Sequence, residues 1–290
     1  MTDLVTIASD HLSAAINPFG AELTHLRDPQ GRELMTDADP AFWTGCAPLL
    51  FPIVGAVVGD RYRVDGVDHA MPKHGFARRS RFDTVEAGEG HARFRLIDGP
   101  ETRAAYPFAF SLEIAFAVRD ATLAMTATLA NTGDRDLPAS FGYHPAFAWP
   151  LPYGAAKTDH RMVFDAGDRG SLLALDADGL IAGERPSPLD GRTLTLTDDL
   201  FADDALIWTP PFAARGLTYG ASVGPLLRID WDAPMLGVWT RPGAAFVCVE
   251  PWRGHADPLG FAGDIWNKPG ILRLAPGERR AFVMSVTLTS

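Results

Sequence analysis

Two histidines and one glutamate each lie in an apolar, turn-rich stretch of the chain, which is an unusual setting for an ionisable side chain. His74 stands in the sequence KHGFAR, His144 in GYHPAF and Glu250 in CVEPW. An imidazole has an ordinary pKa of about 6.5 and a glutamate carboxyl one of about 4.3, so both can exchange protons near neutral pH. The combination predicts general acid/base chemistry on an uncharged polar substrate.

Each of the three residues also has a purely structural interpretation. His74 could lie in a solvated surface turn. His144 could be a hydrogen-bonded core histidine, because residues 137–156 contain no Asp, Glu, Lys or Arg. Glu250 ends an apolar run, and a buried glutamate is either paired with a cation or functional.

Neighbouring side chains are candidates for binding the substrate. Arg78 carries a planar guanidinium, which suits bidentate contacts to hydroxyls, carboxylates or phosphates. Trp252, next but one to Glu250, could form an apolar platform, although tryptophan is equally common in cores. Asp204 is a weaker candidate, because acids paired at a turn usually face water. The cluster RRSR at 78–81 is typical of a solvated loop but could meet a phosphate.

The elements that must position these residues are predicted to be strands. Alternation with a period of two dominates the sequence, whereas amphipathic helical patterns are scarce and only residues 201–206 suggest one short turn. Residues 169–192 are rich in Asp, Gly and Pro and are interpreted as a long surface excursion. Many strands with Gly, Pro and Asp turns predict an all-β, large sandwich or barrel. The predicted strands and hairpins cover residues 5–16, 91–97, 111–128, 226–230 and 282–288.

Composition narrows the class of protein. The 290 residues are 47% hydrophobic and 21% charged, which is an ordinary globular balance. A net charge of −10 disfavours binding to nucleic acid or to an anionic membrane. Pro40–Gly59 is free of charge but broken by prolines and glycines, so we expect buried irregular chain there rather than a membrane span. The first residues resemble no signal peptide, and the expected location is the cytoplasm.

Familiar motifs for other chemistries are missing from the sequence. There is no P-loop, no GxGxxG and no HExxH. The two cysteines, Cys46 and Cys248, lie far apart and are interpreted as buried thiols. The histidines are dispersed, with only His69 and His74 near metal-ligand spacing. The sequence therefore implies neither a cofactor nor a metal.

These segments, in this order, resemble the aldose 1-epimerase (galactose mutarotase-like) family, and the Glu-Pro-Trp form is similar to a bacterial-type branch of it. The resemblance implies a single domain over residues 1–290, a large antiparallel β-sandwich (a supersandwich), and interconversion of the α and β anomers of an aldose. The blocks that carry it are GAEL at 20–23, the stretch 48–59, HGFAR at 74–78, GYHPAF at 142–147, CVEPW at 248–252 and the late stretch 268–278.

The resemblance also implies roles for the candidate residues. Glu250 would be the general base that takes the proton from the C1 hydroxyl, and His144 the general acid that protonates the ring oxygen. The ring would open, C1 would rotate, and the roles would reverse on closure. His74 would bind the sugar and assist polarisation, and Asp204 would hold sugar hydroxyls. Arg78 and Trp252 would complete the substrate-binding set, with no cofactor and a small sugar as the only partner.

One departure from the family pattern bears on the substrate. Many relatives have an arginine where this chain has Ala56, which cannot bind a hydroxyl. Arg78 or Arg61 would then substitute, or the substrate preference has changed, or catalysis is weak. A related branch acts on hexose 6-phosphates through arginines, and Arg79 and Arg81 beside Arg78 keep that alternative open.

Two further alternatives remain at this point. A non-catalytic carbohydrate-binding protein on the same fold would keep the aromatic residues and would not need Glu250 or His144 for turnover. A glycoside hydrolase would need a second carboxylate across the glycosidic bond, for which Asp204 or Asp257 could partner Glu250. The pattern of two histidines argues against the hydrolase.

Overall fold

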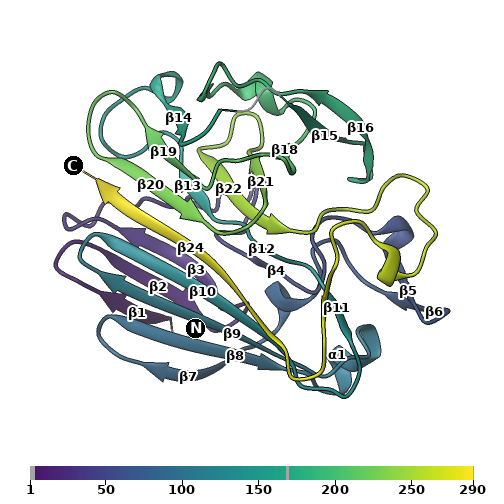
Figure 1. Cartoon of the computed structure of the whole chain (residues 1–290). Coiled ribbons are helices and arrows are strands. Elements are labelled where there is room, and N and C mark those ends of the chain that lie inside the picture. Colours follow the sequence, from purple (N-terminus) through teal and green to yellow (C-terminus); the bar gives the residue numbers. More distant parts are fainter. Residues whose placement is uncertain (1–3, 168–169, 290) are drawn as a thin grey trace.

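The computed structural model describes residues 4–167 and 170–289, and the described backbone is mostly β-strand (Figure 1). The longest sheet has nine strands in the order β17-β14-β19-β20-β24-β10-β9-β8-β7. In chain order these are β7 (Asp83–Ala87), β8 (His91–Ile97), β9 (Phe110–Arg119), β10 (Thr122–Asn131), β14 (Arg161–Phe164), β17 (Thr193–Thr195), β19 (Gly216–Gly220), β20 (Leu226–Trp231) and β24 (Arg279–Thr289).

A second sheet has eight strands and carries the candidate site. Its order is β16-β15-β18-β21-β22-β12-β4, and β13 also pairs with β22. The strands are β4 (Leu49–Leu50), β12 (Phe141–Tyr143), β13 (Ala146–Ala148), β15 (Ser171–Leu175), β16 (Ile181–Pro186), β18 (Leu206–Trp208), β21 (Met235–Trp239) and β22 (Phe246–Arg253).

Smaller elements complete the chain. Three short sheets are formed by β1 (Val5–Ala8), β2 (Ser13–Asn17) and β3 (Glu22–Arg27), by β5 (Arg61–Val64) with β6 (Val67–Ala70), and by β11 (Leu137–Ala139) with β23 (Leu272–Leu274). The helices are α1 (Pro100–Ala105) and the 3-10 turns η1 (Val58–Asp60), η2 (Ala77–Arg79), η3 (Lys157–Asp159), η4 (Asp198–Phe201) and η5 (Ile265–Asn267).

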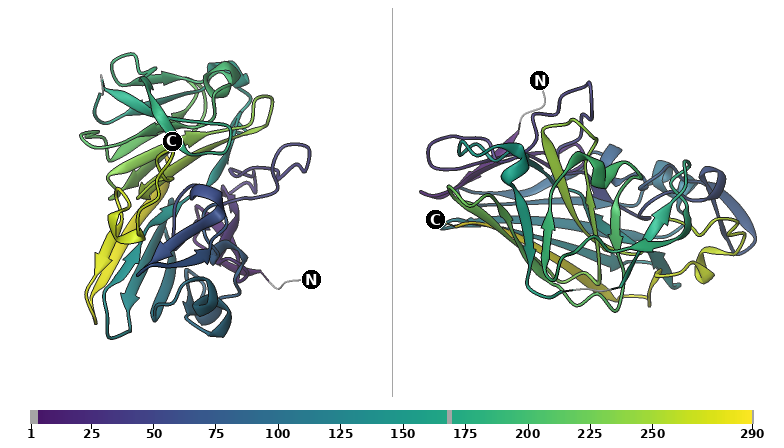
Figure 2. Two further views of the ribbon diagram at one scale, coloured as in Figure 1. Left: turned by 90° about the vertical axis from the view of Figure 1, so that its right-hand side faces the viewer. Right: turned by 90° about the horizontal axis from the view of Figure 1, so that it is seen from above.

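The two large sheets pack on each other through aromatic side chains. Phe141 of β12 stacks on Phe282 of β24 with ring centroids 4.8 Å apart, and the Tyr143 hydroxyl donates a hydrogen bond to the Phe282 carbonyl at 3.0 Å. In Figure 1 most strands of the eight-stranded sheet lie in the upper half, together with β14, β19 and β20 of the nine-stranded sheet. Strands β7–β10 lie in the lower half, beside β1–β3. The left-hand view of Figure 2 shows the same separation of the green and purple strands. The fold is thus the mostly antiparallel β-sandwich that the sequence predicts.

The long hairpin β9–β10 shows why alternation predicts these strands. Along β9, Leu112, Ile114 and Phe116 are buried while the residues between them are half-buried. Because successive side chains of a strand point to opposite faces, this pattern turns one face of the strand to the core. The turn falls at Asp120 and Ala121, inside the hairpin predicted for residues 111–128.

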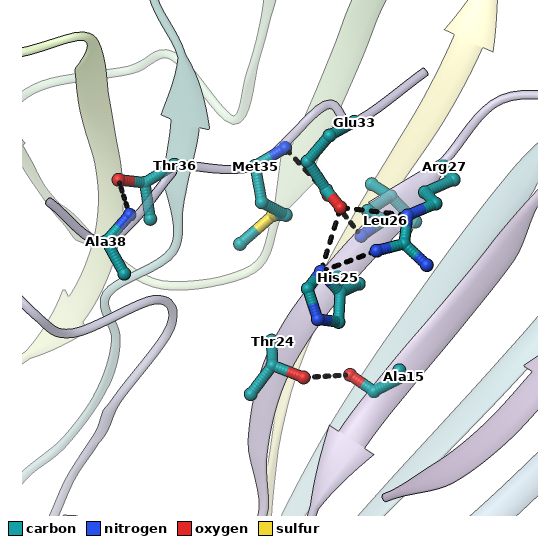
Figure 3. A network of polar contacts seen from close by, with 9 residues as sticks. All are labelled: Ala15, Thr24, His25, Leu26, Arg27, Glu33, Met35, Thr36 and Ala38. Carbon is teal, nitrogen blue, oxygen red and sulfur yellow. Dashed lines mark hydrogen bonds and ion pairs between the residues drawn. The ribbon is translucent and has the colours of Figure 1, made fainter. Parts of the chain in front are cut away.

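Glu33 fixes the segment that follows β3 (Figure 3). Its carboxylate accepts hydrogen bonds from the backbone N–H groups of Leu26, at 3.0 Å, and Met35, at 3.2 Å, and lies 2.8 Å from His25 Nδ1. The anchored segment runs beside β13, where Thr36 N–H donates to the Ala146 carbonyl at 3.0 Å. This contact supports the backbone next to His144.

Several other sequence-based expectations can be compared with the structure. The strands predicted at 91–97, 226–230 and 282–288 are confirmed as β8, β20 and part of β24, and the hairpin at 5–16 is confirmed as β1–β2. Within 201–206, η4 ends at Phe201 and a turn follows, in which Asp204 N–H donates to the Phe201 carbonyl at 3.2 Å. Within 170–192, the predicted surface excursion contains β15 and β16 at the edge of a sheet, so that interpretation was incomplete.

The stretch 40–59 is irregular chain, as predicted. It contains only the two-residue strand β4 and the start of η1, and residues 47–57 are buried. Among the helices of residues 4–167 and 170–289, we find none with the length and apolar character needed to cross a bilayer.

Candidate active site

Strand β22 carries Glu250 on the face of the eight-stranded sheet that points away from the main core. Val247 and Val249 belong to the large core between the sheets, whereas Cys248 joins a separate apolar cluster on the opposite face. Because side chains alternate along a strand, Glu250 lies on the same face as Cys248. Its carboxyl group lines a cavity, yet the residue is only 1% exposed.

His144 lies in the gap between β12 and β13, and both of these short strands pair with β22. Gly142 is opposite Trp252 on one side of the gap, and Ala146 is opposite Cys248 on the other. The register is the same on both sides, so His144 lies opposite Glu250. Its Nε2 is 3.2 Å from Glu250 Oε2, and the histidine is 7% exposed.

His74 reaches the same cavity from a tight turn. Its backbone adopts a φ of +68°, and Gly75 follows with a φ of +72°. A methyl group on Gly75 would lie 2.1 Å from the Phe51 carbonyl oxygen, so only glycine fits there. The Gly55 N–H donates to His74 Nδ1 at 3.1 Å. Nδ1 is therefore the acceptor, and in the neutral ring Nε2 carries the proton.

Trp252 lies over two glycines of the neighbouring strands. A methyl group on Gly142 of β12 would lie 2.5 Å from its indole ring, and one on Gly237 of β21 would lie 2.8 Å from it. Larger residues at either position would displace the ring. The glycines therefore let the indole form part of the cavity wall beside Glu250.

The cavity that these residues share has a volume of about 300 Å³. Trp43 and Trp239 flank His144, with ring centroids 5.0 and 5.8 Å from the imidazole. The His74 and His144 rings meet edge to face at 5.8 Å. The other lining residues are Gly55, Lys73, Arg78, Leu175, Gly179, Asp204, Ala205, Ile207, Arg241, Glu250, Trp252 and Ala256. Such a polar and aromatic pocket is typical of a small-molecule site.

Burial favours the uncharged forms of the central groups. The pKa of Glu250 is raised well above its ordinary value, mainly by burial and further by the negative charge of Asp204, while Lys73 acts in the opposite direction. The pKa of His144 is lowered to about 3, mainly by burial, with the charges of Arg78 and Lys73 acting in the same direction. Burial likewise lowers the pKa of His74.

Four buried polar atoms of cavity-lining residues have no hydrogen-bond partner within residues 4–167 and 170–289. They are His144 Nδ1, Glu250 Oε2, Trp252 Nε1 and Arg78 Nε. Buried polar atoms are normally hydrogen-bonded, and leaving one without a partner costs about 1–3 kcal/mol. Three of the four belong to the wall around Glu250. The cavity is therefore suited to a ligand rich in hydroxyl groups.

All six residues singled out from the sequence line this one cavity. They are His74, Arg78, His144, Asp204, Glu250 and Trp252. Asp204 is half-buried and lines the cavity, whereas the adjacent Asp203 is exposed. Arg79 and Arg81 are exposed and are not among the lining residues.

Other candidates lie elsewhere. Arg61 lines a second cavity of about 260 Å³ on the far side of residues 55–58, so of the two arginines considered as substitutes at Ala56 only Arg78 reaches the site. Asp257 is ion-paired with Lys268, both nearly fully buried, and it lines the second cavity rather than facing Glu250. This position removes Asp257 as the second carboxylate of a glycosidase.

Sequence reasoning missed four aromatic or charged lining residues: Trp43, Lys73, Trp239 and Arg241. Trp43 lies in the charge-free stretch that was interpreted only as buried chain. Trp239 ends a strand and Arg241 starts the turn after it, which are ordinary places for both residue types. Lys73 adjoins His74, and this adjacency was the one available signal.

The family model for aldose 1-epimerase matches residues 3–286. This chain belongs to the aldose 1-epimerase family. Among curated relatives, the chromosomal LacX protein of Lactococcus lactis subsp. lactis is 27% identical, over 98% of this chain and 99% of LacX. Two solved structures have a TM-score of 0.92 to this chain. They are a galactose mutarotase related enzyme of Lactobacillus acidophilus, 29% identical over 99% of this chain and 98% of its own, and a galactose mutarotase-like protein of Lactobacillus casei ATCC 334, 26% identical over 99% and 100%.

Membership of the aldose 1-epimerase family accounts for the architecture and supports a role on sugars. A cavity with paired acid/base groups, aromatic walls and unpartnered polar atoms agrees with such a role.

Proposed function

We propose that the protein interconverts the α and β anomers of an aldose by opening and closing the sugar ring, without a cofactor. The observation that carries the proposal is the 3.2 Å contact between His144 Nε2 and Glu250 Oε2 in the wall of a 300 Å³ cavity. An anomer exchange needs one group to accept a proton and a second to donate one, on the two oxygens bonded to C1. The pair supplies both groups at one place.

The proposed reaction uses the two groups in turn. Glu250 takes the proton of the C1 hydroxyl while His144 gives a proton to the ring oxygen, so the bond between C1 and the ring oxygen breaks and an aldehyde forms. The C1 aldehyde then rotates about its bond to C2. On closure, His144 takes the proton back from the ring oxygen hydroxyl and Glu250 returns one to the carbonyl oxygen. No net proton is gained or lost.

The electrostatics favour the ring-opened stage. The pair holds a single proton, which lies on His144 when Glu250 acts as the base and on Glu250 once the ring has opened. Burial raises the pKa of Glu250 and lowers that of His144, so both shifts favour the second state.

The remaining lining residues would hold the sugar. With its Nδ1 occupied by the Gly55 N–H, His74 has an Nε2–H group free to donate toward the ring oxygen or a hydroxyl. The Trp252 indole offers an apolar face and an N–H donor that has no hydrogen-bond partner among residues 4–167 and 170–289. Arg78 and Asp204 offer a donor and an acceptor to further hydroxyl groups.

The test is polarimetry of freshly dissolved α-D-glucose and α-D-galactose. The wild-type protein is expected to accelerate mutarotation, and Glu250→Gln to lose about 10²–10⁴-fold of the rate because one proton-transfer partner is removed. Glu22→Gln is the matched control, since burial also raises the pKa of Glu22 but this residue is not among those lining the cavity. Equal loss in the two variants would contradict the assignment.

A phosphorylated sugar is the second candidate substrate, and the charges at the cavity favour it. Lys73, Arg78 and Arg241 line the cavity, and within the described ranges none of them forms an ion pair with a carboxylate. Their positive charges are therefore available to an anion, and arginine suits phosphate in particular.

Competition separates the two substrates. If the substrate is a hexose 6-phosphate, glucose 6-phosphate should inhibit the mutarotation of free glucose at concentrations well below those of free glucose itself. Arg241→Gln should weaken that inhibition while leaving the turnover of free sugar close to the wild-type rate. Absence of acceleration with free and phosphorylated sugars alike would favour carbohydrate binding without catalysis.

A further inference from the structure

Cys248 is a buried thiol that the proposed reaction does not use. The residue is fully buried, it forms no disulfide, and it precedes Glu250 by two positions on β22. Residues two apart on a strand share a face, so the thiol is directed to the side of the sheet that carries the catalytic pair. Ala146 of β13 is opposite Cys248 on one side, and Trp239 of β21 is opposite it on the other.

The thiol completes a compact set of three ligating groups. One ligating atom each of His144, Cys248 and Glu250 lies within 4.8 Å of the others, and all three residues are buried. They come from neighbouring segments of one sheet, because His144 is opposite Glu250 and Cys248 lies diagonally across from it. The backbone therefore holds the three groups together before any ion binds.

The donor types indicate which ions would fit. Zn²⁺ accepts sulfur, imidazole nitrogen and carboxylate oxygen, at bond lengths of about 2.0–2.3 Å, and open zinc sites use three protein ligands. Mg²⁺ and Ca²⁺ require oxygen ligands and suit this set poorly. Glu250 Oε2, a candidate ligand atom, is buried and has no hydrogen-bond partner in the described part of the chain. An ion would satisfy a group that the protein leaves unpaired.

We propose that His144, Cys248 and Glu250 form a binding site for Zn²⁺ or a similar thiophilic divalent cation, and that the bound ion inhibits the protein. Binding requires the cavity as the entry path, since His144 and Glu250 line it and Cys248 lies behind them. Coordination forms a metal–sulfur bond and releases the thiol proton to solvent, and no electron is transferred.

The inhibition part rests on the proposed function, whereas the binding part does not. An ion coordinated by His144 and Glu250 occupies the groups proposed to move protons, so sugar and ion would compete for the site. The ion is thus an inhibitor and not a cofactor. A fourth position, open to the cavity, would be filled by water.

The experiment uses the untagged full chain and three proteins: wild type, Cys248→Ala and Cys46→Ala. Cys46 is the matched control, because it is the other free cysteine and does not belong to the set. Co²⁺ is the spectroscopic probe, since a cobalt–thiolate bond gives a charge-transfer band in the near ultraviolet. Zn²⁺ affinity is measured by competition with a chromophoric chelator, with Mg²⁺ as the control ion.

The expected result is one Zn²⁺ bound per chain and a cobalt–thiolate band in wild type and Cys46→Ala. In Cys248→Ala the band should disappear and Zn²⁺ should bind about 10–100-fold more weakly, at least the loss seen when a supporting partner of a ligand is removed. Near-ultraviolet circular dichroism establishes that Cys248→Ala is folded, and Cys248→Ser repeats the test with a second side chain.

Three outcomes would overturn the proposal: no cobalt–thiolate band in wild type, unchanged Zn²⁺ affinity in both Cys248 variants, or equal binding of Mg²⁺. Where sugar turnover is measurable, Zn²⁺ should raise the apparent KM and lower kcat little, and Cys248→Ala should escape this effect at an unchanged basal rate. Binding without inhibition would contradict the inhibitory role alone. A protein that binds Zn²⁺ through Cys248 but turns over no sugar would contradict the proposed function and leave the site standing.

Discussion

His144 lies directly across from Glu250 because β12 and β13, the short strands before and after it, pair with β22 in one unbroken register. Their side chains come within 3.2 Å of each other as a consequence of backbone pairing. The sheet, and not a hydrogen bond between the two groups, therefore sets the geometry. Removing either side chain should leave the other in place, which makes the pair suited to single and double substitution.

His74→Asn tests the donor role of His74. Asparagine tolerates the left-handed backbone found at this position, and its side-chain oxygen can still accept from the Gly55 N–H. What is lost is a donor placed toward the sugar, and we expect kcat/KM to fall about 10²-fold, as for removal of one preorganised donor. Steady-state polarimetry measures this. A variant with the wild-type kcat/KM would show that His74 has no part in the reaction.

The central residues could be predicted from the sequence because each is an ionisable side chain in an apolar or uncharged stretch. Glu250 ends an apolar run of the sequence, and His144 is the one side chain that ordinarily titrates near neutral pH in a stretch otherwise free of charge. Burying such groups costs free energy, so their presence in an apolar pattern indicates function. The hairpin β9–β10 could be predicted because a strand with one buried face alternates apolar and more polar residues.

The rest of the site depends on contacts that no local pattern records. Trp43 and Trp239 are ordinary core residues in the sequence, and only the pairing of distant segments brings both onto His144. The register of β22 fixes which residue faces Glu250, and it is set by strands about a hundred residues away. The excursion at 170–192 was interpreted as surface because Asp, Gly and Pro mark turns, but short edge strands also contain them.

Gly75→Ala should destabilise the fold through a steric clash. Its new methyl group would lie 2.1 Å from the Phe51 carbonyl oxygen, in addition to the strain of a φ of +72°. We expect the free energy of unfolding in urea to fall by more than about 2 kcal/mol, since strain alone costs about 1–2 kcal/mol. Gly66→Ala is the control, because its φ is +83° and no atom lies within 4 Å of the added methyl group. Equal losses in the two variants would mean that the close approach at Gly75 is unimportant.

Lys268→Met should leave a buried carboxylate without its cation. Asp257 and Lys268 are 2% and 4% exposed and form an ion pair, and Asp257 Oδ2 also accepts from Val58 N–H at 3.0 Å. We expect a loss of about 3–5 kcal/mol in the free energy of unfolding. In the double variant with Asp257→Asn, the charge is gone and the acceptor for Val58 remains, so the loss should be smaller. A double variant less stable than the single one would refute this explanation.

His160 should contribute to the loss of stability in acid. Its Nδ1 donates to the Ala156 carbonyl, and its Nε2 accepts from Leu151 N–H at 3.0 Å, so the folded protein holds the neutral ring. Burial lowers its pKa below the ordinary value of about 6.5. Below pH 6.5 the unfolded chain therefore binds a proton that the folded chain resists, and stability falls as the pH falls.

The control for this pH dependence is His160→Gln, which cannot titrate. Between pH 7 and pH 5 its free energy of unfolding should decline less steeply than that of the wild type, by at most about 1.4 kcal/mol per pH unit for one proton. The other buried histidines contribute equally to both proteins, so the difference in slope belongs to His160. Parallel slopes would show that its pKa is the same in the folded and unfolded states.

The central claim is that His144 and Glu250 act as one proton-transferring unit, and a double-mutant cycle on mutarotation tests it most directly. Rates would be measured by polarimetry for wild type, His144→Asn, Glu250→Gln and the double variant. Groups that act as a unit are strongly non-additive. We expect the double variant to be no more than a few-fold slower than the slower single variant. A double variant slower by the product of the two single losses, or a single variant with wild-type activity, would contradict the account.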